Sequence, residues 1–272
     1  MVGVPIPKRL ARSVASIAVV VYACLFVYGY AFADKLIFQP HASSYRDSGR
    51  IIKLISGDGV TISAVFLPAP AARYTILYSH GNAEDLGEIL PDLQEIQRMG
   101  FSVLAFDYHG YGTSEGRPSE RAAYQDEDAA YDYLVKTERV PASRIIALGR
   151  SLGGGTAVDL GSRRPLGGLI VQSSFVSAFR AMTHVPIVPF DEFRNVAKIG
   201  QVHCPVLVIH GRADKVIALW HGERLFREAN EPKRAFWVEG AGHDDLFEVA
   251  GASYTTALRS SVALIDSTAS RP

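Results

Sequence analysis

The fold is decided by residues 144–155, which read RIIALGRSLGGG. The apolar half predicts a buried strand, and the small residues after it predict the start of a helix. Between the two lies Gly149-x-Ser151-x-Gly153. A sharp strand-to-helix turn holds its central serine in a strained conformation, with Oγ above the sheet edge. Glycines are needed on either side because a side chain there would collide with the neighbouring strand or helix.

Apolar segments alternate with helical patterns along the rest of the chain. We expect further strands at 51–56, 60–67, 74–79, 101–107, 168–174, 205–211 and 234–238, and helices at 84–99, 119–138, 218–229 and 246–266. Parallel strands need a crossover connection, and uniformly apolar strands are covered on both faces. The sequence therefore predicts an α/β domain with a mostly parallel sheet of about eight strands and helices on both faces.

Composition excludes several classes of function. The 272 residues carry 28 basic and 28 acidic side chains, so no global charge favours nucleic acid. Cys24 and Cys204 form no disulfide framework, and we expect both to be inert buried thiols. The eight histidines show no close-spaced ligand cluster. We therefore expect no metal site and no cofactor.

The N-terminus contains a candidate membrane span. Residues 14–33 carry no charge, and this length of 20 residues is enough to cross a bilayer. Lys8, Arg9 and Arg12 precede it, and basic flanks prefer the cytoplasm, so we expect a single-pass anchor with the rest outside the cytoplasm. A cleaved signal peptide is the alternative, because residues 31–33 have a small-x-small pattern. The protein would then be secreted or periplasmic. A buried core helix is a third interpretation.

These patterns divide the chain into three parts. Residues 1–33 form a cytoplasmic stub and anchor, or a signal sequence. Residues 34–50 form a polar linker. Residues 51–272 form the α/β domain, with a short lid at about 173–203, between the sixth and seventh strands.

The serine at the turn predicts two partners. A serine hydroxyl is a poor nucleophile until a base removes its proton, and the base needs an acid to orient it. Asp214 follows the strand at 205–211, and His243 follows the strand at 234–238. Both lie after the serine, in the order acid then histidine. We therefore expect Ser151, Asp214 and His243 to form a catalytic triad.

Other polar residues compete for these roles. We expect Asp107 to brace the loop that follows it, and Asp244 or Asp245 to cap the final helix. His80 and His210 also end strands, and we expect each to hydrogen-bond neighbouring loops rather than act as the base.

Attack on a carbonyl group needs N–H donors for the oxyanion. The Leu152 N–H follows the serine at a helix N-terminus and is one candidate. The second should come from the loop after the strand at 74–79, where we expect the Asn82 N–H, with Ala83 as the alternative. Asn82 could instead cap the helix that follows it.

The lid segment is rich in apolar residues. These are Phe175, Val176, Phe179, Met182, Val185, Pro186, Ile187, Val188, Pro189 and Phe190. They either pack on the core or form an apolar wall for an acyl chain. On the second interpretation we expect Phe175, Phe179 and Met182 to contact the substrate.

Six motifs, in this order, resemble a known family. They are Ser79-His80-Gly81-Asn82-Ala83, Asp107-Tyr108-x-Gly110-Tyr111-Gly112, Gly116-Arg117-Pro118-Ser119-Glu120-Arg121, Gly149-x-Ser151-x-Gly153, His210-Gly211-x-x-Asp214-x-Val216-Ile217 and Trp237-Val238-Glu239-Gly240-Ala241-Gly242-His243. From about Lys53 onward, the chain resembles the alpha/beta-hydrolase superfamily, and more narrowly the membrane-associated serine hydrolases of the alpha/beta-hydrolase-domain-17 type. The resemblance implies the alpha/beta-hydrolase fold and removal of palmitate from cysteine thioesters. It departs at the N-terminus, where that family has a lipidated cysteine-rich segment.

We therefore expect a membrane-anchored serine hydrolase that cleaves lipid-like carboxylic esters or acyl thioesters through an acyl-enzyme. Two alternatives remain, a serine aminopeptidase-like amidase and a non-catalytic binding protein on this fold.

Overall fold

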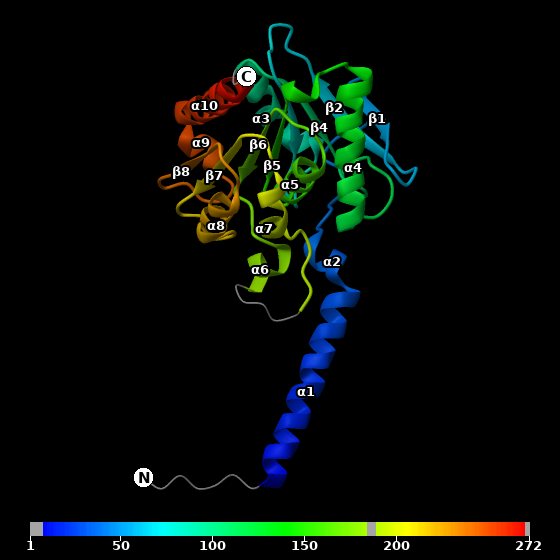
Figure 1. Cartoon of the computed structure of the whole chain (residues 1–272). Helices are drawn as coiled ribbons and strands as arrows, with labels where there is room; N and C mark the ends of the chain where they lie inside the picture. Colours follow the sequence, from blue (N-terminus) through cyan, green and yellow to red (C-terminus); the bar gives the residue numbers. More distant parts are fainter. Residues whose placement is uncertain (1–7, 184–188, 270–272) are drawn as a thin grey trace.

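The computed structural model describes residues 8–183 and 189–269. Its centre is one eight-stranded sheet in the order β1-β2-β4-β3-β5-β6-β7-β8 (Figure 1). The strands are β1 Ile51–Ile55, β2 Thr61–Leu67, β3 Thr75–Ser79, β4 Ser102–Phe106, β5 Ile145–Arg150, β6 Gly168–Gln172, β7 Val206–Gly211 and β8 Lys233–Val238. The expected mostly parallel sheet is confirmed, with strand bounds that differ from the predictions by no more than two residues.

The strand order reverses at β3, in the middle of the sheet. β1, β2 and β4 pair antiparallel, and every pair from β4 through β3 to β8 is parallel. β3 lies between β4 and β5, so the chain leaves β3 in one direction and later returns on its other side. A crevice at the carboxyl ends of such strands is where open α/β sheets bind ligands.

Helices cover both faces of the sheet, as expected. They are α3 Leu86–Arg98, α4 Glu120–Asp132, α5 Gly153–Arg163, α8 Trp220–Glu228, α9 Leu246–Ala250 and α10 Ala252–Ala269. Two separate apolar clusters form the core. One packs α4, α5 and α8 on one face of the sheet, and the other packs α3, α9 and α10 on the opposite face.

Two predicted helices differ from the structure. The helix expected at 246–266 is broken at Gly251, whose φ of 50° is unfavourable for residues with a side chain, and this separates α9 from α10. The helix expected at 119–138 ends as α-helix at Asp132 and continues as a π-helix over Tyr133–Thr137.

The segment between β6 and β7 is short and irregular. It contains α6 Ala178–Thr183, α7 Asn195–Lys198 and a 3-10 turn at Ile199–Gln201. A further 3-10 turn, Ala142–Arg144, precedes β5. Residues 184–188 of the expected lid lie outside the described residues.

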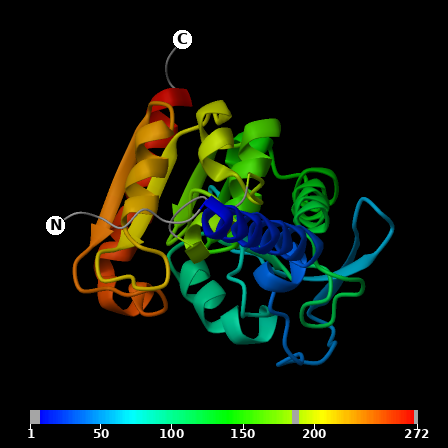
Figure 2. The same cartoon turned by 90° about the horizontal axis from the view of Figure 1, so that it is seen from below.

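The N-terminal helix α1, Lys8–Ala31, projects away from the sheet. Its part from Arg12 to Ala31 has a mean hydropathy of 2.0 and is only 6% buried. Within residues 8–183 and 189–269, it is the one helix long and apolar enough to cross a membrane. Figure 1 shows that it leaves the domain at the end that carries α6 and α2, Ala33–Ile37, and it lies in front of the domain in the view from below (Figure 2).

Residues 34–50, which we expect to form a polar linker, contact the domain at several points. Phe38 is buried and packs on Phe193, with ring centroids 5.8 Å apart. The Tyr45 hydroxyl donates to Asp107 at 2.5 Å. The linker is therefore fastened to the domain next to the carboxyl edge of the sheet.

Candidate active site

Ser151 lies in the strained turn that the motif predicts. Its φ is 52°, in the left-handed region that residues with side chains rarely adopt. A Cβ at Gly149 would collide with the Gly153 carbonyl group, and a Cβ at Gly153 would collide with the Ser79 carbonyl group. The Ser151 N–H donates to Gln172 of β6 at 2.9 Å, which fixes the turn against the neighbouring strand.

The loops after β7 and β8 bring two partners to this serine. His243 Nε2 lies 3.0 Å from Ser151 Oγ, and His243 Nδ1 lies 2.8 Å from Asp214 Oδ2. The other oxygen of Asp214 accepts from the Val216 and Ile217 N–H groups at 2.9 and 2.8 Å. The carboxylate is thus held by its own loop and points at the imidazole.

The surroundings favour an ionised carboxylate. Burial of Asp214 opposes its ionisation, but the hydrogen bond and charge of His243 and the Ile217 N–H hold its pKa below the ordinary value. His210 lies beside this pair, with Nε2 3.5 Å from Asp214 Oδ2. Burial lowers the pKa of His210, and its Nε2 donates to the Ile217 carbonyl group at 2.8 Å. His210 therefore braces the acid loop, as expected.

The remaining rivals are also occupied elsewhere. His80 Nδ1 contacts the Gly81 carbonyl group at 2.7 Å. The Asp107 carboxylate accepts from the Leu86 N–H at 2.9 Å as well as from Tyr45, so it fastens α3 and the linker. Its carbonyl group accepts from Ser114 Oγ at 2.9 Å, which holds its own loop.

Neither aspartate after the histidine caps the final helix, contrary to expectation. Asp245 precedes α9, but its side chain accepts from the Gly242 N–H at 2.6 Å and makes no capping bond to the helix. Asp244 is exposed and pairs with Arg150 instead.

The two expected oxyanion donors, the Asn82 and Leu152 N–H groups, belong to residues that line the same cavity as Ser151. Within the described part of the chain, neither donates to another protein atom. The Asn82 side chain does not cap α3, which has Asp85 as its N-cap. Instead, Asn82 Nδ2 donates to the Ile37 carbonyl group at 2.5 Å, and Oδ1 accepts from Gln39 N–H at 3.0 Å.

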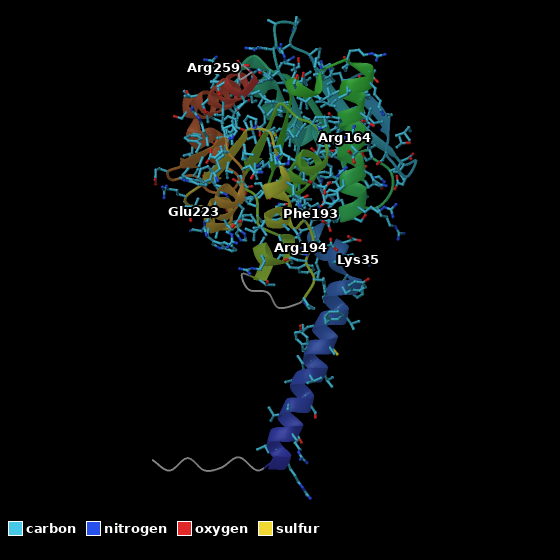
Figure 3. The ribbon with its side chains drawn as sticks, viewed as in Figure 1. Lys35, Arg164, Phe193, Arg194, Glu223 and Arg259 are labelled. Carbon is cyan, nitrogen blue, oxygen red and sulfur yellow. The ribbon has the colours of Figure 1, made fainter. Side chains whose placement is uncertain are left out.

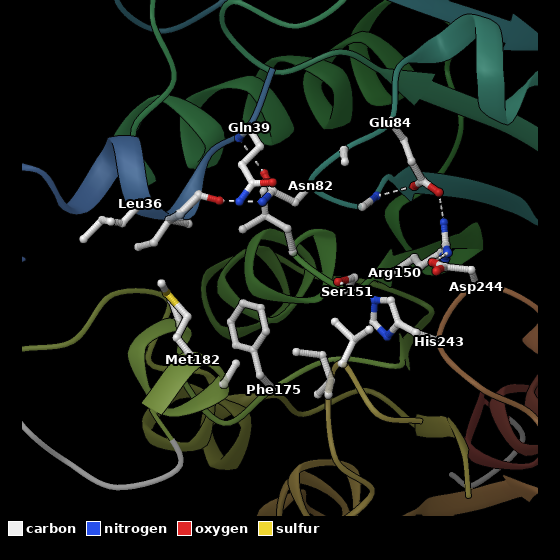
Figure 4. Close-up of a pocket in the computed structure, with 18 of the residues that line it drawn as sticks. Leu36, Gln39, Asn82, Glu84, Arg150, Ser151, Phe175, Met182, His243 and Asp244 are labelled. Atoms are coloured by element: carbon white, nitrogen blue, oxygen red, sulfur yellow. Dashed lines mark hydrogen bonds and ion pairs between the residues drawn. The ribbon is translucent and has the colours of Figure 1, made fainter. Parts of the chain in front are cut away.

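A cavity of about 800 Å³ opens beside the serine (Figure 4). Phe175 and Met182 line it, as expected, but Phe179 does not. The Phe179 ring packs edge-on against Phe190, with centroids 5.6 Å apart. Residue spacing alone could not decide this, because the direction of each side chain depends on where the short α6 lies.

Several lining residues were not anticipated from the sequence. They are Leu36, Ile37 and Gln39 from the linker, Ala178 and Ala181 from α6, and Val216 and Ile217 from the acid loop. The sequence contains no motif that indicates the linker residues, because the residues they contact lie far away in the sequence. The position of Val216 and Ile217 beside the cavity could have been inferred, because their N–H groups must turn toward the Asp214 carboxylate.

Arg150, next to the serine, was also missed. Its guanidinium pairs with Glu84 and lies 2.9 Å from Asp244, and its side chain is only 11% exposed. Glu84 in turn accepts from the Gly81 N–H at 2.7 Å. One arginine therefore connects the loop after β3 to the loop that carries His243.

The described residues contain no group of three or more His, Cys, Asp or Glu side chains arranged to hold a metal ion. The chemistry that this site can perform is nucleophilic, since a hydroxyl, an imidazole and a carboxylate lie in series beside a cavity.

Comparison with known proteins gives the family. A family model described as "Serine aminopeptidase, S33" matches residues 70–195. Alpha/beta hydrolase domain-containing protein 17B of Xenopus laevis is 36% identical over 210 residues, covering 76% of this chain and 73% of the relative. Protein 17C of Mus musculus is 40% identical over 185 residues, covering 65% and 57%.

Solved structures share the fold. The esterase Pf2001 of Pyrococcus furiosus superposes with a TM-score of 0.71 at 16% identity, over 83% of this chain and 98% of its own. Est1E of Butyrivibrio proteoclasticus, solved with ferulic acid, gives a TM-score of 0.65 at 17% identity, over 77% and 99%. Together with the serine at the strand-to-helix turn and the order of the sheet, the sequence relatives show that this chain belongs to the alpha/beta hydrolase family.

Proposed function

We propose that this protein is a membrane-anchored serine hydrolase that cleaves carboxylic esters or acyl thioesters through a Ser151–His243–Asp214 triad. The observation that carries the proposal is the series of contacts from Ser151 Oγ to His243 Nε2 at 3.0 Å and from His243 Nδ1 to Asp214 Oδ2 at 2.8 Å. Family membership makes hydrolysis the expected reaction class.

The reaction would proceed in two halves. His243 Nε2 takes the Ser151 proton while Oγ attacks the carbonyl carbon, and Asp214 stabilises the imidazolium. The Asn82 and Leu152 N–H groups stabilise the oxyanion. When the carbon–oxygen or carbon–sulfur bond breaks, His243 gives its proton to the departing alcohol or thiol.

Deacylation repeats these steps with water. His243 takes a proton from water, whose oxygen attacks the acyl carbon, and the proton then returns to Ser151 Oγ as the acid is released. Water thus replaces the proton that left with the alcohol or thiol, and the proton balance needs only this chain, the substrate and water.

The cavity supports a lipid-like acyl group. Leu36, Ile37, Phe175 and Met182 provide apolar surface beside the nucleophile. Its volume of about 800 Å³ falls in the range of small-molecule sites, which bury apolar parts of a ligand against such side chains. We propose that the acyl chain packs against these apolar side chains and that the alcohol or thiol leaves on the side of the cavity where Arg150 lies.

The anchor is part of the proposal. We propose that residues 1–33 form a cytoplasmic stub and a single-pass span, that 34–50 connect it to the catalytic domain of 51–272, and that this domain lies outside the cytoplasm. Lys8, Arg9 and Arg12 before the span support this orientation. Cleavage after residue 33 is the alternative, and the release of the protein from washed membranes would demonstrate it.

The decisive experiment uses the full chain in detergent micelles. Wild type should label with a fluorophosphonate and hydrolyse p-nitrophenyl esters and acyl thioesters, with a rate that rises with acyl length. Ser151→Ala should abolish both. Ser267→Ala, which changes an exposed serine on α10, is the matched control. Equal labelling of the wild type and Ser151→Ala would refute the enzyme, and a flat length profile would refute the lipid preference.

An amidase is the second candidate, and two observations favour it. The matching family model is described as a serine aminopeptidase, and Asp92 lines the cavity, where it could hold a substrate amine. Glu88 lines the cavity too, but its carboxylate contacts His41 and accepts from the Asp85 N–H. Glu84 and Asp244 also line it but are paired with Arg150. Aminoacyl p-nitroanilides separate the two candidates. If they react faster than p-nitrophenyl esters, the ester proposal gives way to the amidase.

A further inference from the structure

A second cavity lies on the other side of α6 and shares no lining residue with the first. It encloses about 360 Å³ between α6, α8 and the chain that runs from Pro189 to α7. Arg180, Arg194 and Arg224 line it, and we call it the arginine cavity. The volume falls within the usual range for small-molecule sites.

The arginine cavity carries excess positive charge. Asp191 is the one acidic residue among the lining residues that the structure describes, and its carboxylate accepts from Ser177 Oγ and from the Phe179 and Glu192 N–H groups at 2.5 to 2.9 Å. Asp191 is therefore fully engaged by its own segment. Arg224 pairs with Glu228 on α8 at 2.8 Å, outside the cavity lining.

Two of the arginines have no carboxylate partner among the described residues. Arg194 is exposed, and Arg180 has a buried Nε without a hydrogen-bond acceptor. The guanidinium of Arg180 lies over the Trp220 ring, 5.4 Å from its centroid. A buried donor without an acceptor is costly, and a guanidinium fork suits a phosphate group, which it can bind through two hydrogen bonds.

The wall of the arginine cavity also contacts α1. Phe190 lines the cavity and packs edge-on against Phe26 and Tyr30, with ring centroids 5.3 and 5.6 Å apart. Both aromatic residues lie near the C-terminal end of the apolar helix. That end is where a span meets the polar headgroups of the bilayer, and aromatic side chains favour this level. The cavity is thus placed at the height of lipid phosphates.

We propose that the arginine cavity binds the phosphate group of an anionic membrane lipid, with Arg180 and Arg194 as its ligands. The inference rests on the membrane anchoring proposed above and is independent of the hydrolysis chemistry. α6 contributes Arg180 to the lining of the arginine cavity and Met182 to the lining of the cavity beside Ser151. A bound headgroup would therefore hold the helix that forms part of the acyl wall.

Trp220 gives a direct readout, because it lies under Arg180 and the chain has only one other tryptophan. The full chain carrying Trp237→Phe is titrated in maltoside micelles with dioctanoyl phosphatidylglycerol, dioctanoyl phosphatidylcholine or inorganic phosphate, at constant ionic strength. We expect a saturable change in Trp220 fluorescence with phosphatidylglycerol. Phosphatidylcholine and inorganic phosphate should require at least about tenfold higher concentrations.

Variants then assign the site. Arg180→Gln and Arg194→Gln should each weaken phosphatidylglycerol binding by about tenfold or more, since each removes a charged hydrogen bond. Arg259→Gln is the matched control, because Arg259 is exposed on α10 at the end of the molecule opposite α1 (Figure 3). Circular dichroism confirms that each variant is folded, and Arg194, being exposed, tests the proposal even if Arg180→Gln misfolds.

Each outcome decides the proposal. Titrations that Arg180→Gln and Arg194→Gln leave unchanged would overturn the site. If inorganic phosphate binds as tightly as the lipid, the lipid assignment is overturned and the site belongs to a soluble phosphate. Because fluorescence is measured without substrate, loss of the hydrolase proposal would leave this result intact. Membrane fractionation tests the anchoring separately.

Discussion

The guanidinium of Arg150 lies 2.9 Å from the carboxylate of Asp244, the residue that follows the proposed base. The same guanidinium pairs with Glu84, which holds the Gly81 N–H at the start of the proposed oxyanion loop. Two loops that are far apart in sequence are therefore set relative to each other by one side chain. Their relative position decides the distance between the oxyanion donors and the imidazole.

Replacing Arg150 by alanine should lower kcat about 10- to 100-fold with little change in KM, because small displacements of catalytic groups are expensive. Arg150→Lys should be intermediate, since an ammonium group cannot form the fork that holds two carboxylates. Ester hydrolysis at saturating substrate measures the effect. Arg212→Ala removes an exposed arginine paired with Glu239 and is the control. An unchanged kcat in Arg150→Ala would contradict a positioning role.

Asp214→Asn should preserve the fold and lower kcat by about 10³- to 10⁴-fold, because an amide cannot hold the imidazole in the required tautomer or stabilise its charged form. Steady-state kinetics and fluorophosphonate labelling measure the loss. Asp47→Asn, which changes an exposed carboxylate in the linker, serves as the control. A loss below about tenfold would show that Asp214 is not the acid of the triad.

The mostly parallel sheet and the relative positions of Ser151, Asp214 and His243 were predictable because each of the three lies in the turn or loop that follows a predicted strand. Strand ends converge on one edge of a parallel sheet, so local patterns were enough to place them. Leu36 and Gln39 were not predictable as cavity residues. Their positions depend on the bond between Gln39 and Asn82, 43 residues apart, which leaves no periodic signal.

Details that depend on side-chain direction or on single contacts were also beyond the sequence. Phe179 and Met182 belong to the same short helix, yet only Met182 reaches the catalytic cavity. Arg150 has two carboxylate partners from different loops. Gly251 interrupts a continuous helical pattern, and an isolated glycine in such a pattern is usually tolerated.

Glu127 should make stability depend on pH. Its side chain is fully buried and accepts a hydrogen bond from Ser79 Oγ at 2.8 Å. Burial raises the pKa of Glu127 to about 8 from an ordinary value of 4.5. Between these values the folded state keeps the proton and the unfolded state loses it, so stability falls as pH rises, by about 1.4 kcal/mol per pH unit. Glu127→Gln removes this ionisation.

The melting temperature of Glu127→Gln should therefore rise relative to that of the wild type between pH 5 and pH 8. This difference in melting temperature should level off above pH 8. Thermal unfolding by circular dichroism at pH 5, 6.5, 8 and 9 measures it. Glu248→Gln, which changes an exposed glutamate, should show no such trend. A difference independent of pH would mean that Glu127 does not hold its proton in the folded state.

Asn82→Ala separates the side chain of Asn82 from its N–H group. The side chain joins the linker at Ile37 and Gln39 to the loop after β3, and it accepts from the Tyr111 hydroxyl at 2.7 Å. Alanine keeps the main-chain donor but releases the loop, so we expect kcat to fall about tenfold or more through a misplaced oxyanion donor. Tyr111→Phe removes only the hydroxyl and should cost less. If Asn82→Ala raises KM alone, the linker serves to bind the acyl chain and does not position the donor.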